Sequence, residues 1–514
     1  MNKAIITIFI LLSSHIAKTD SKPNIVFILL DDAGLSDISY YVDYYDTPNI
    51  DSIFRLGIKL SQYHKRSTCT PARSALLSGI HPMRYGLNQS MVQSNDDIFY
   101  KMPRDTIILS EYLRQIGYTT GIIGKWHLGN IRMDLPPSRG FDYSFISKKV
   151  PKDYYTWSNS NNFYSMQTIV ENGYPVQSDS TYLIDKWYDK AANFINHSAD
   201  NFFISKGKSP FFLYLADTSP RAPNIGKSEC VQTSNFKSEF PEHFNKHSNP
   251  TRLGRYCQMK ATDEGIGKII QCMKRKGILD NTLIIITSDN EAVTNIENNW
   301  NHPYKSGKGR LYEGGTHVFC TMYQKNKYEN MVINEQIDVT DWLPTILNIV
   351  EFENISKSVH GVSFKNLIDG HLSKKRNNII LDYTPGRRWG ILTHNGDKIG
   401  VNLGNARGVP LSNRDIGNLE IYNLYSDEME EQNLKENTQY NSIEALTDSL
   451  DNLYDNWQSP NKVTMKYFVK NIRKNSSLHD AIHYTSLTNY GYSHLIAKIF
   501  HLKSVSRNDE KWNL

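Results

Sequence analysis

Four short apolar segments, each followed at once by polar residues, restrict the fold of this chain most strongly. The segments are residues 24–30, 119–123, 211–216 and 282–287. They are apolar throughout and do not alternate with polar residues, which is typical of strands buried on both faces of a sheet. Stretches with helical spacing lie between them, at 107–116 and 261–276. The sequence therefore predicts an α/β fold, with a mostly parallel sheet flanked by helices.

The polar residues that follow these strands are expected to share one site. In open α/β sheets, ligands collect beyond the carboxyl ends of the strands. Asp31-Asp32 and Asp289-Asn290 follow two of the strands directly. Two adjacent carboxylates need a cation nearby, and carboxylate and amide oxygens suit Ca²⁺ or Mg²⁺ better than zinc. Either pair alone would be explained by helix caps and turns, but the two together favour a metal site.

A lone cysteine precedes a predicted helix. Cys69 opens the run Cys-Thr-Pro-Ala-Arg, and Pro71 is well placed near a helix start. An anion is favoured at such a start, and Arg73, about one turn further on, is placed to hold a negative group beside residue 69. A single cysteine is more often an inert buried residue, so the surrounding pattern has to decide its role.

The pattern C-x-P-x-R at residues 69–73 resembles the signature of the sulfatases. Other segments resemble blocks of that family in the same order, over roughly residues 23–435: 23–32, 124–129, 139–142, 313–315, 341–345 and 422–427. Ordered motifs in their expected strand contexts rarely coincide by chance. The chain is therefore identified as a member of the sulfatase family. The resemblance is closest to arylsulfatase B, which removes the 4-sulfate of N-acetylgalactosamine in glycosaminoglycans. It is carried by residues 69–84, 86–87, 89, 135–136 and 298–300.

The resemblance implies an alkaline-phosphatase-like sandwich with a large mixed, mostly parallel sheet flanked by helices, and a small C-terminal domain with an antiparallel sheet. Apolar runs at 379–381, 389–393, 398–401 and 420–424 fit the strands of that small sheet. We expect four parts: a signal peptide at 1–20, a catalytic sulfatase domain at 21–373, the small C-terminal domain at 374–460 and a basic tail at 461–514.

By resemblance, Cys69 is oxidised to formylglycine by the formylglycine-generating enzyme, and the hydrated aldehyde is the nucleophile. One Ca²⁺ ion would be held by four oxygen-bearing side chains, with residue 69 also touching it. These side chains are Asp31, Asp32, Asp289 and Asn290.

The resemblance also assigns the groups around the sulfate. Lys125 and Lys308 would bind the sulfate, and Arg73 would orient the hydrated aldehyde. His127 would take a proton from the second hydroxyl, so that sulfate leaves and the aldehyde re-forms. Lysines and Ca²⁺ would stabilise the charge that develops in the transition state.

The sequence departs from the family at two places. Arg221 stands where the family has a histidine that contacts the sulfate and helps the leaving group. Arginine binds sulfate well but cannot donate a proton at neutral pH, and general-acid help is typically worth about 10²–10⁴-fold in rate. Asn290-Glu291-Ala292 stands where the family usually has two glycines, which leaves the shape of this loop open.

Three functions fit these residues to different degrees. The first is a Ca²⁺-dependent sulfuric ester hydrolase of the arylsulfatase type that acts on sulfated glycans. The second, motivated by Arg221 and the basic tail, is a catalytically weakened protein that binds sulfated glycans. The third is a phosphodiesterase or phosphatase on the same fold, which would use a Thr or Ser nucleophile and two zinc ions. Cys69 and the oxygen-rich ligand set argue against the third.

The first residues predict export. Lys3 precedes an apolar run at 4–12 and small residues follow, which is typical of a secretory signal, cleaved here between 17 and 21. The run is too short to span a bilayer, and we expect no transmembrane segment elsewhere. Four glycosylation sequons fit an exported glycoprotein that is lysosomal or extracellular. They are at Asn88, Asn196, Asn354 and Asn475.

The net charge of +5 is small for 514 residues, but it is unevenly placed. Residues 461–514 carry +6, so the rest of the chain is close to neutral. This segment has no dense run of Lys and Arg, so we interpret it as a solvated basic face and expect no nucleic-acid partner.

Four cysteines remain once Cys69 is assigned to the site. In an exported protein they allow two disulfides, with three pairings, and the sequence does not choose among them. They are Cys230, Cys257, Cys272 and Cys320.

Overall fold

The structure is a computed structural model that describes residues 22–88, 90, 101–149, 151–157, 169–233, 249–294, 300–372, 378–384, 388–402 and 419–434. The expected signal peptide at 1–20 and the basic tail at 461–514 lie outside the described residues. The proposed domain boundaries therefore stay predictions.

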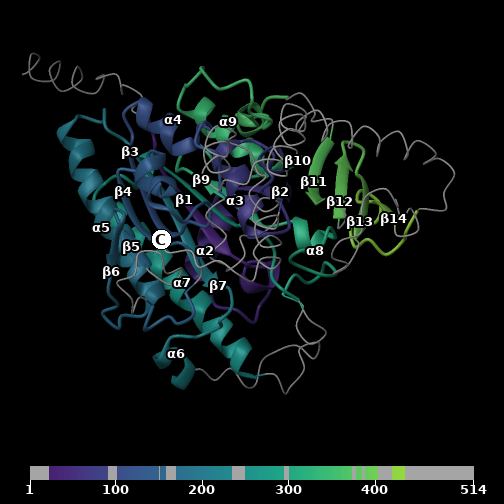
Figure 1. The fold of residues 1–514 in the computed structure, drawn as a ribbon, viewed down its shortest axis with the longest axis horizontal. Coiled ribbons are helices and arrows are strands. Elements are labelled where there is room, and N and C mark those ends of the chain that lie inside the picture. The colour runs from purple at the N-terminus through teal and green to yellow at the C-terminus, as the bar shows by residue number, and fades with distance from the viewer. Residues whose placement is uncertain are drawn as a thin grey trace, which may run out of the picture.

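A ten-stranded sheet forms the centre of the molecule (Figure 1). Its strands are β1 (Asn24–Asp31), β2 (Ile58–His64), β3 (Thr119–Lys125), β4 (Tyr143–Ser147), β5 (Ile169–Glu171), β6 (Tyr174–Val176), β7 (Phe211–Pro220), β8 (Thr282–Ser288), β9 (Cys320–Tyr323) and β10 (Met331–Asp338). Their order is β10-β2-β9-β8-β1-β7-β3-β4-β5-β6. From β8 to β4 all neighbours are parallel, whereas β9, β5 and β6 pair antiparallel. The sheet is mixed and mostly parallel, which confirms the predicted α/β class.

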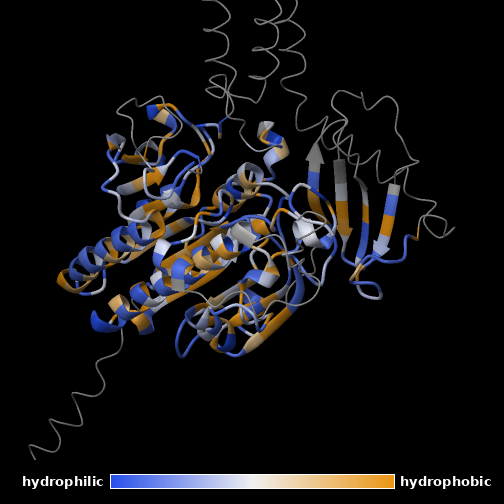
Figure 2. Cartoon of the chain, turned by 90° about the horizontal axis from the view of Figure 1, so that it is seen from below, coloured by the Kyte–Doolittle hydropathy of each residue, from blue (hydrophilic) through white to orange (hydrophobic). Residues whose placement is uncertain are grey.

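Helices cover both faces of this sheet, which explains why its central strands are apolar throughout. Along β1, Phe27 belongs to one hydrophobic core and Ile28 to the other. The first core includes residues of α3 (Cys69–Ser78), α4 (Leu109–Gln115) and α9 (Trp342–Ile349). The second includes residues of α2 (Pro48–Leu56), α5 (Leu183–Ile204) and α7 (Asn249–Arg275). In Figure 2 the strands are largely hydrophobic, and the helices beside them carry both hydrophobic and hydrophilic residues.

The register of the central strands brings their carboxyl ends level. Leu30 of β1 pairs with Ser288 of β8, and Asp31 pairs with Pro220 of β7. On the other side of β7, Gly124 of β3 pairs with Ala216. The polar residues that follow these four strands therefore lie at one edge of the sheet, as the sequence predicts.

A second sheet, of four antiparallel strands, lies beyond the edge of the large sheet that is formed by β2 and β10 (Figure 1). Its strands follow in chain order, and their positions confirm the four predicted runs. They are β11 (Asn378–Thr384), β12 (Arg388–Thr393), β13 (Asp397–Asn402) and β14 (Leu419–Asn423).

One disulfide links α6 (Ser228–Thr233) to α7, between Cys230 and Cys257. Cys272 and Cys320 are buried free thiols, as is Cys69. The structure thus selects one pairing out of those that the sequence leaves open, and the second conceivable disulfide does not form.

Among the helices of the described residues, none combines the length and the hydropathy that a membrane crossing requires.

Gly124 of β3 pairs with Ala216 of β7, and we expect it to tolerate no side chain. Its φ is +105°, and a Cβ atom here would lie 1.9 Å from the carbonyl oxygen of Ala216. Gly117 has a similar φ of +89°, but its Cβ would meet no atom closer than 3.9 Å. We predict that Gly124→Ala destabilises the protein by about 1–3 kcal/mol more than Gly117→Ala, measured from urea denaturation midpoints. Equal losses in the two variants would show that backbone strain alone is responsible.

Candidate active site

Carboxylates from two strands meet at the carboxyl edge of the large sheet. Asp31 is the last residue of β1, Asp32 comes directly after it, and Asp289 comes directly after β8. All three are buried. Asp32 has a positive φ of 61°, and its amide donates to Asp289 Oδ1 at 3.2 Å. The parallel register of β1 and β8 therefore concentrates three negative groups at one point.

Cys69 lies over this cluster as the first residue of α3. Its Sγ atom is 3.5 Å from Asp31 Oδ1 and 3.7 Å from Asp32 Oδ1. Burial, with Asp289 nearby, raises the pKa of the Cys69 thiol. Every residue of α3 is buried, so the helix that carries the cysteine is anchored within the protein.

The donor set fits a hard divalent cation. One ligand atom from each of Asp31, Asp32, Cys69 and Asp289 can be chosen so that all lie within 4.8 Å of one another. Asn290 donates its Nδ2 group to Asp32 Oδ1 at 2.7 Å, while its Oδ1 atom is buried without a hydrogen-bond partner among the described residues. Three clustered carboxylates with a side-chain amide in contact are a donor set suited to Ca²⁺ or Mg²⁺.

Two buried cationic side chains form ion pairs with these carboxylates. Lys125, at the end of β3, donates to both oxygens of Asp31 at 2.8 and 2.9 Å. Arg73 of α3 pairs with Asp289 at 2.8 Å. Burial alone would raise the pKa of Asp289, but Arg73 and Lys125 lower it to about 2. Burial lowers the pKa of Lys125 despite its contact with Asp31.

Two further cations reach the sulfur of Cys69. Lys308 Nζ lies 3.0 Å from Sγ and also pairs with Asp32. Arg221, which follows β7, places Nη1 3.1 Å from Sγ and contacts both Asp31 and Asp32 at 3.7 Å. Its side chain is 29% exposed, against 13% for Lys308. Four cations thus surround three carboxylates, so an anion next to residue 69 meets a net positive charge.

His127 follows β3 two residues after Lys125. Its backbone has a positive φ of 59°, and its Nδ1 atom lies 3.2 Å from the hydroxyl of Thr70. Burial, with Lys125 and Arg221 nearby, lowers the pKa of His127 well below its ordinary range. The ring is therefore neutral at physiological pH and can accept a proton.

The loop at residues 290–292, where the sequence departs from the family, is held by hydrogen bonds from the neighbouring segment. The backbone amide of Ala292 donates to Asn301 Oδ1 at 2.9 Å, and its carbonyl accepts from Asn301 Nδ2 and from the backbone amide of Lys308, both at 3.0 Å. Glu291 is buried, and burial raises its pKa well above the ordinary value. Burial therefore favours the protonated form of Glu291, and its neighbour Asn290 keeps its contact with Asp32.

The structure brings all the predicted site residues together, and it adds two that sequence reasoning missed. Thr70 lies within the C-x-P-x-R motif, where its position next to Cys69 was an available signal. Arg255 of α7 donates to the carbonyl of Asp32 at 2.7 Å and pairs with Asp37. No local pattern marks Arg255, because it reaches the site from a helix more than 200 residues further along the chain.

Comparisons with known proteins agree with this geometry. Residues 23–351 match the sequence model of a family described as Sulfatase. Arylsulfatase J of Mus musculus is 30% identical over 340 residues, which cover 64% of this chain and 53% of the relative. N-acetylgalactosamine-6-sulfatase of Rattus norvegicus is 30% identical over 316 residues, which cover 57% of this chain and 55% of the relative. The chain therefore spans about half the length of these curated relatives.

A solved structure shares the fold over most of its length. The crystal structure of Ps i-CgsB superimposes with a TM-score of 0.71 at 24% identity, covering 86% of this chain and 94% of that chain. A second structure of Ps i-CgsB is a complex with k-i-k-neocarrahexaose.

Proposed function

The chain belongs to the sulfatase family, and we propose that it hydrolyses sulfate esters, with sulfated glycans as the substrate class. The observation that supports this most is the position of Cys69 at the meeting point of three carboxylates and four cations. Such a site attracts an anion to residue 69 and holds a divalent cation beside it. The names of the relatives, with the glycan complex of Ps i-CgsB, support glycans as the class.

Residue 69 is proposed to act as formylglycine, produced from Cys69 by the formylglycine-generating enzyme. The raised pKa of the buried thiol makes unmodified Cys69 a poor nucleophile. Formylglycine, when present, supplies an aldehyde whose hydrate carries the attacking hydroxyl. Arg73 is proposed to orient residue 69, and its guanidinium is fixed by Asp289 and by the carbonyl of Lys125.

One Ca²⁺ ion is proposed to be held by Asp31, Asp32, Asp289 and Asn290, with residue 69 beside it. When bound, the ion supplies positive charge for the sulfate oxygens in the transition state. Lys308 is placed to bind sulfate directly, since its ammonium already contacts Sγ of residue 69.

His127 is proposed as the general base. Burial keeps its imidazole neutral. A proton on Nδ1, donated to the hydroxyl of Thr70 at 3.2 Å, would leave Nε2 free to accept a proton from residue 69. The Thr70 hydroxyl can donate or accept, so this contact orients the ring in either tautomer.

The contact between Arg221 and Cys69 favours a second candidate function. An arginine here binds sulfate but donates no proton, so an alkoxide leaving group lacks an acid at this position. The alternative is a catalytically weakened protein that binds sulfated glycans. For the hydrolase, we also propose a substrate like that of arylsulfatase B. We propose in addition that the protein is a glycoprotein of the secretory pathway, lysosomal or extracellular.

The first test is the chemical state of residue 69 in protein from its native source. We expect the peptide containing residue 69 to carry an aldehyde, detected by mass spectrometry and by an aldehyde-trapping reagent. The same preparation should release sulfate from an aryl sulfate, and Cys69→Ala should release none. An unmodified thiol in an inactive native protein would contradict the hydrolase proposal.

Calcium should stabilise the folded protein through Asp289. At a Ca²⁺ concentration of 100 times Kd the gain is about 2.7 kcal/mol, measured as a rise in the thermal midpoint and reversed by a chelator. Asp289→Asn should abolish the response. Asp217→Asn is the matched control, because Asp217 is also a buried carboxylate near the end of a central strand, β7, but accepts hydrogen bonds from Tyr188 and Thr262. A response that survives in Asp289→Asn would contradict this assignment.

Arg221→His separates the two candidate functions. For a hydrolase already adapted to arginine, we expect turnover of a sulfated sugar to change less than about tenfold, and KM to rise because a fixed positive charge is lost. A wild-type rate near zero that rises by about 10²–10⁴-fold in the variant would instead support the binding protein. Initial rates at saturating and limiting substrate give both constants.

A further inference from the structure

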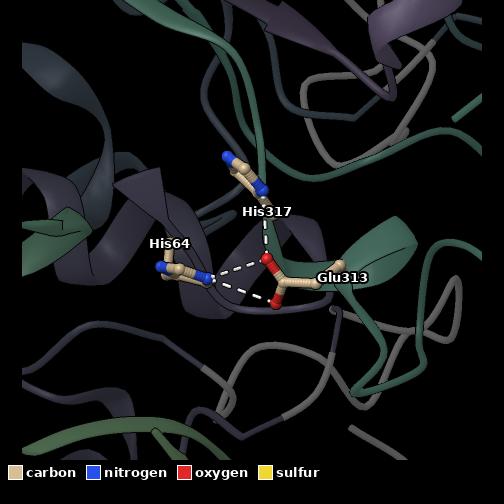
Figure 3. Close-up of side chains that lie close together, drawn as sticks. All are labelled: His64, Glu313 and His317. Carbon is tan, nitrogen blue, oxygen red and sulfur yellow. Dashed lines mark hydrogen bonds and ion pairs between the residues drawn. The ribbon is translucent and has the colours of Figure 1, made fainter. Parts of the chain in front are cut away.

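A second buried cluster of titratable residues lies outside the candidate active site. Glu313 begins α8 (Glu313–Thr316), His317 follows that helix and His64 ends β2. Figure 3 shows the two imidazoles reaching the same carboxylate. His64 Nε2 lies 3.2 Å from both oxygens of Glu313, and His317 Nδ1 lies 3.0 Å from Oε2. All three side chains are buried.

Lys398 brings the small sheet into this cluster. It is a residue of β13, and its ammonium donates to Glu313 Oε1 at 2.7 Å and lies 3.0 Å from Glu430 Oε1. Glu430 also accepts the backbone amide of Glu313 at 2.9 Å. Burial alone would lower the pKa of Lys398, but the two carboxylates raise it. The ammonium is therefore charged, and it joins the two sheets through Glu313.

Two histidines and a glutamate could bind a metal, but the contacts favour an ion-pair cluster instead. We call His64, Glu313, His317, Lys398 and Glu430 the clasp. Lys398 already occupies one oxygen of Glu313. A histidine bound to a metal through Nε2 needs an acceptor for its Nδ1 proton. The Nδ1 atom of His64 is buried and has no hydrogen-bond partner among the described residues. With Nε2 protonated, His64 instead donates to Glu313 and needs no such acceptor.

The clasp is directly connected to the segments that carry the reaction. The amide of Lys65 donates to the carbonyl of Thr316 at 2.8 Å, and the amide of Gly309 donates to the carbonyl of Ser67 at 2.8 Å. These bonds tie the chain just before Cys69 to the chain just after Lys308. His64 and His317 form an isolated bridge between the same two segments.

We propose that Glu313, held by Lys398, is a positioning residue that sets residue 69 and Lys308 relative to each other. The inference rests on the proposed function, because it concerns the same site. Glu313 joins the two segments through its imidazole contacts, and Lys398 fixes Glu313 against the small sheet. The small sheet is then part of the catalytic unit. Because a displacement of about 1 Å can cost on the order of 10²-fold in rate, the clasp affects turnover without touching substrate.

The test compares Lys398→Met with Lys398→Arg. We expect Lys398→Met to lower kcat by about 10- to 100-fold and to change KM less than kcat, because the sulfate-binding side chains remain present. Lys398→Arg keeps the charge and should restore most of the rate. Lys325→Met is the matched control, because Lys325 forms an exposed pair with Asp280 at 2.9 Å. It should behave like the wild type.

Hydrogen exchange provides a readout that does not depend on activity. The amides of Lys65 and Gly309 should exchange faster in Lys398→Met than in the wild type or in Lys325→Met. Unchanged exchange with unchanged kcat would overturn the inference. So would a transition metal in the purified protein, measured by elemental analysis, that His64→Ala removes and Lys398→Met does not.

An inactive wild type would refute the proposed function alone. Exchange at Lys65 and Gly309 would then still decide whether the clasp orders these segments: faster exchange in Lys398→Met supports it, and unchanged exchange refutes it.

Discussion

The neutralisation of three buried carboxylates at the ends of β1 and β8 is the constraint on which the rest of the site depends. Asp31, Asp32 and Asp289 lie side by side because the two strands are parallel and in register. Removing several like charges from water is costly unless cations and hydrogen bonds compensate. The fold therefore has to deliver compensating groups to this point, and they arrive from several separate elements.

Each compensating group also has a chemical task in the proposed reaction. Lys125 arrives with β3 and Arg73 with α3, while Lys308 and Arg221 come from segments that follow other elements. Buried ion pairs contribute little to net stability, because desolvation offsets most of the attraction. Their concentration beside Cys69 is more readily explained by anion binding and by the retention of a divalent cation. Electrostatic preorganisation of this kind is usually the largest contribution to catalysis of group transfer.

The cluster of His64, Glu313 and Lys398 extends the same principle beyond the reacting groups. It uses a buried charge pair to connect the two sheets at the segments that lead to Cys69 and away from Lys308. An apolar contact would hold the sheets together equally well, but it would leave their relative placement less defined. A charged pair with fixed donors and acceptors specifies one arrangement, which suits a site whose groups come from distant parts of the chain.

Much of this fold and site could be predicted from the sequence, because the responsible signals are local. An unbroken apolar run such as residues 24–30 is stable only as a strand buried on both faces, and the polar residues after it must then lie at the sheet edge. The sequence alone thus determined the α/β class and the four small-sheet strands, and it singled out the residues that the structure brings together at the candidate site. Only the tertiary structure decided which groups meet across long separations. Lys308 and Asp32 are 276 residues apart, and Lys398 and Glu313 are 85 apart. The disulfide between Cys230 and Cys257 and the contact of Arg255 with Asp32 belong to the same class. Such contacts depend on how helices and loops pack against the sheet, and no periodicity or motif along the chain encodes that packing.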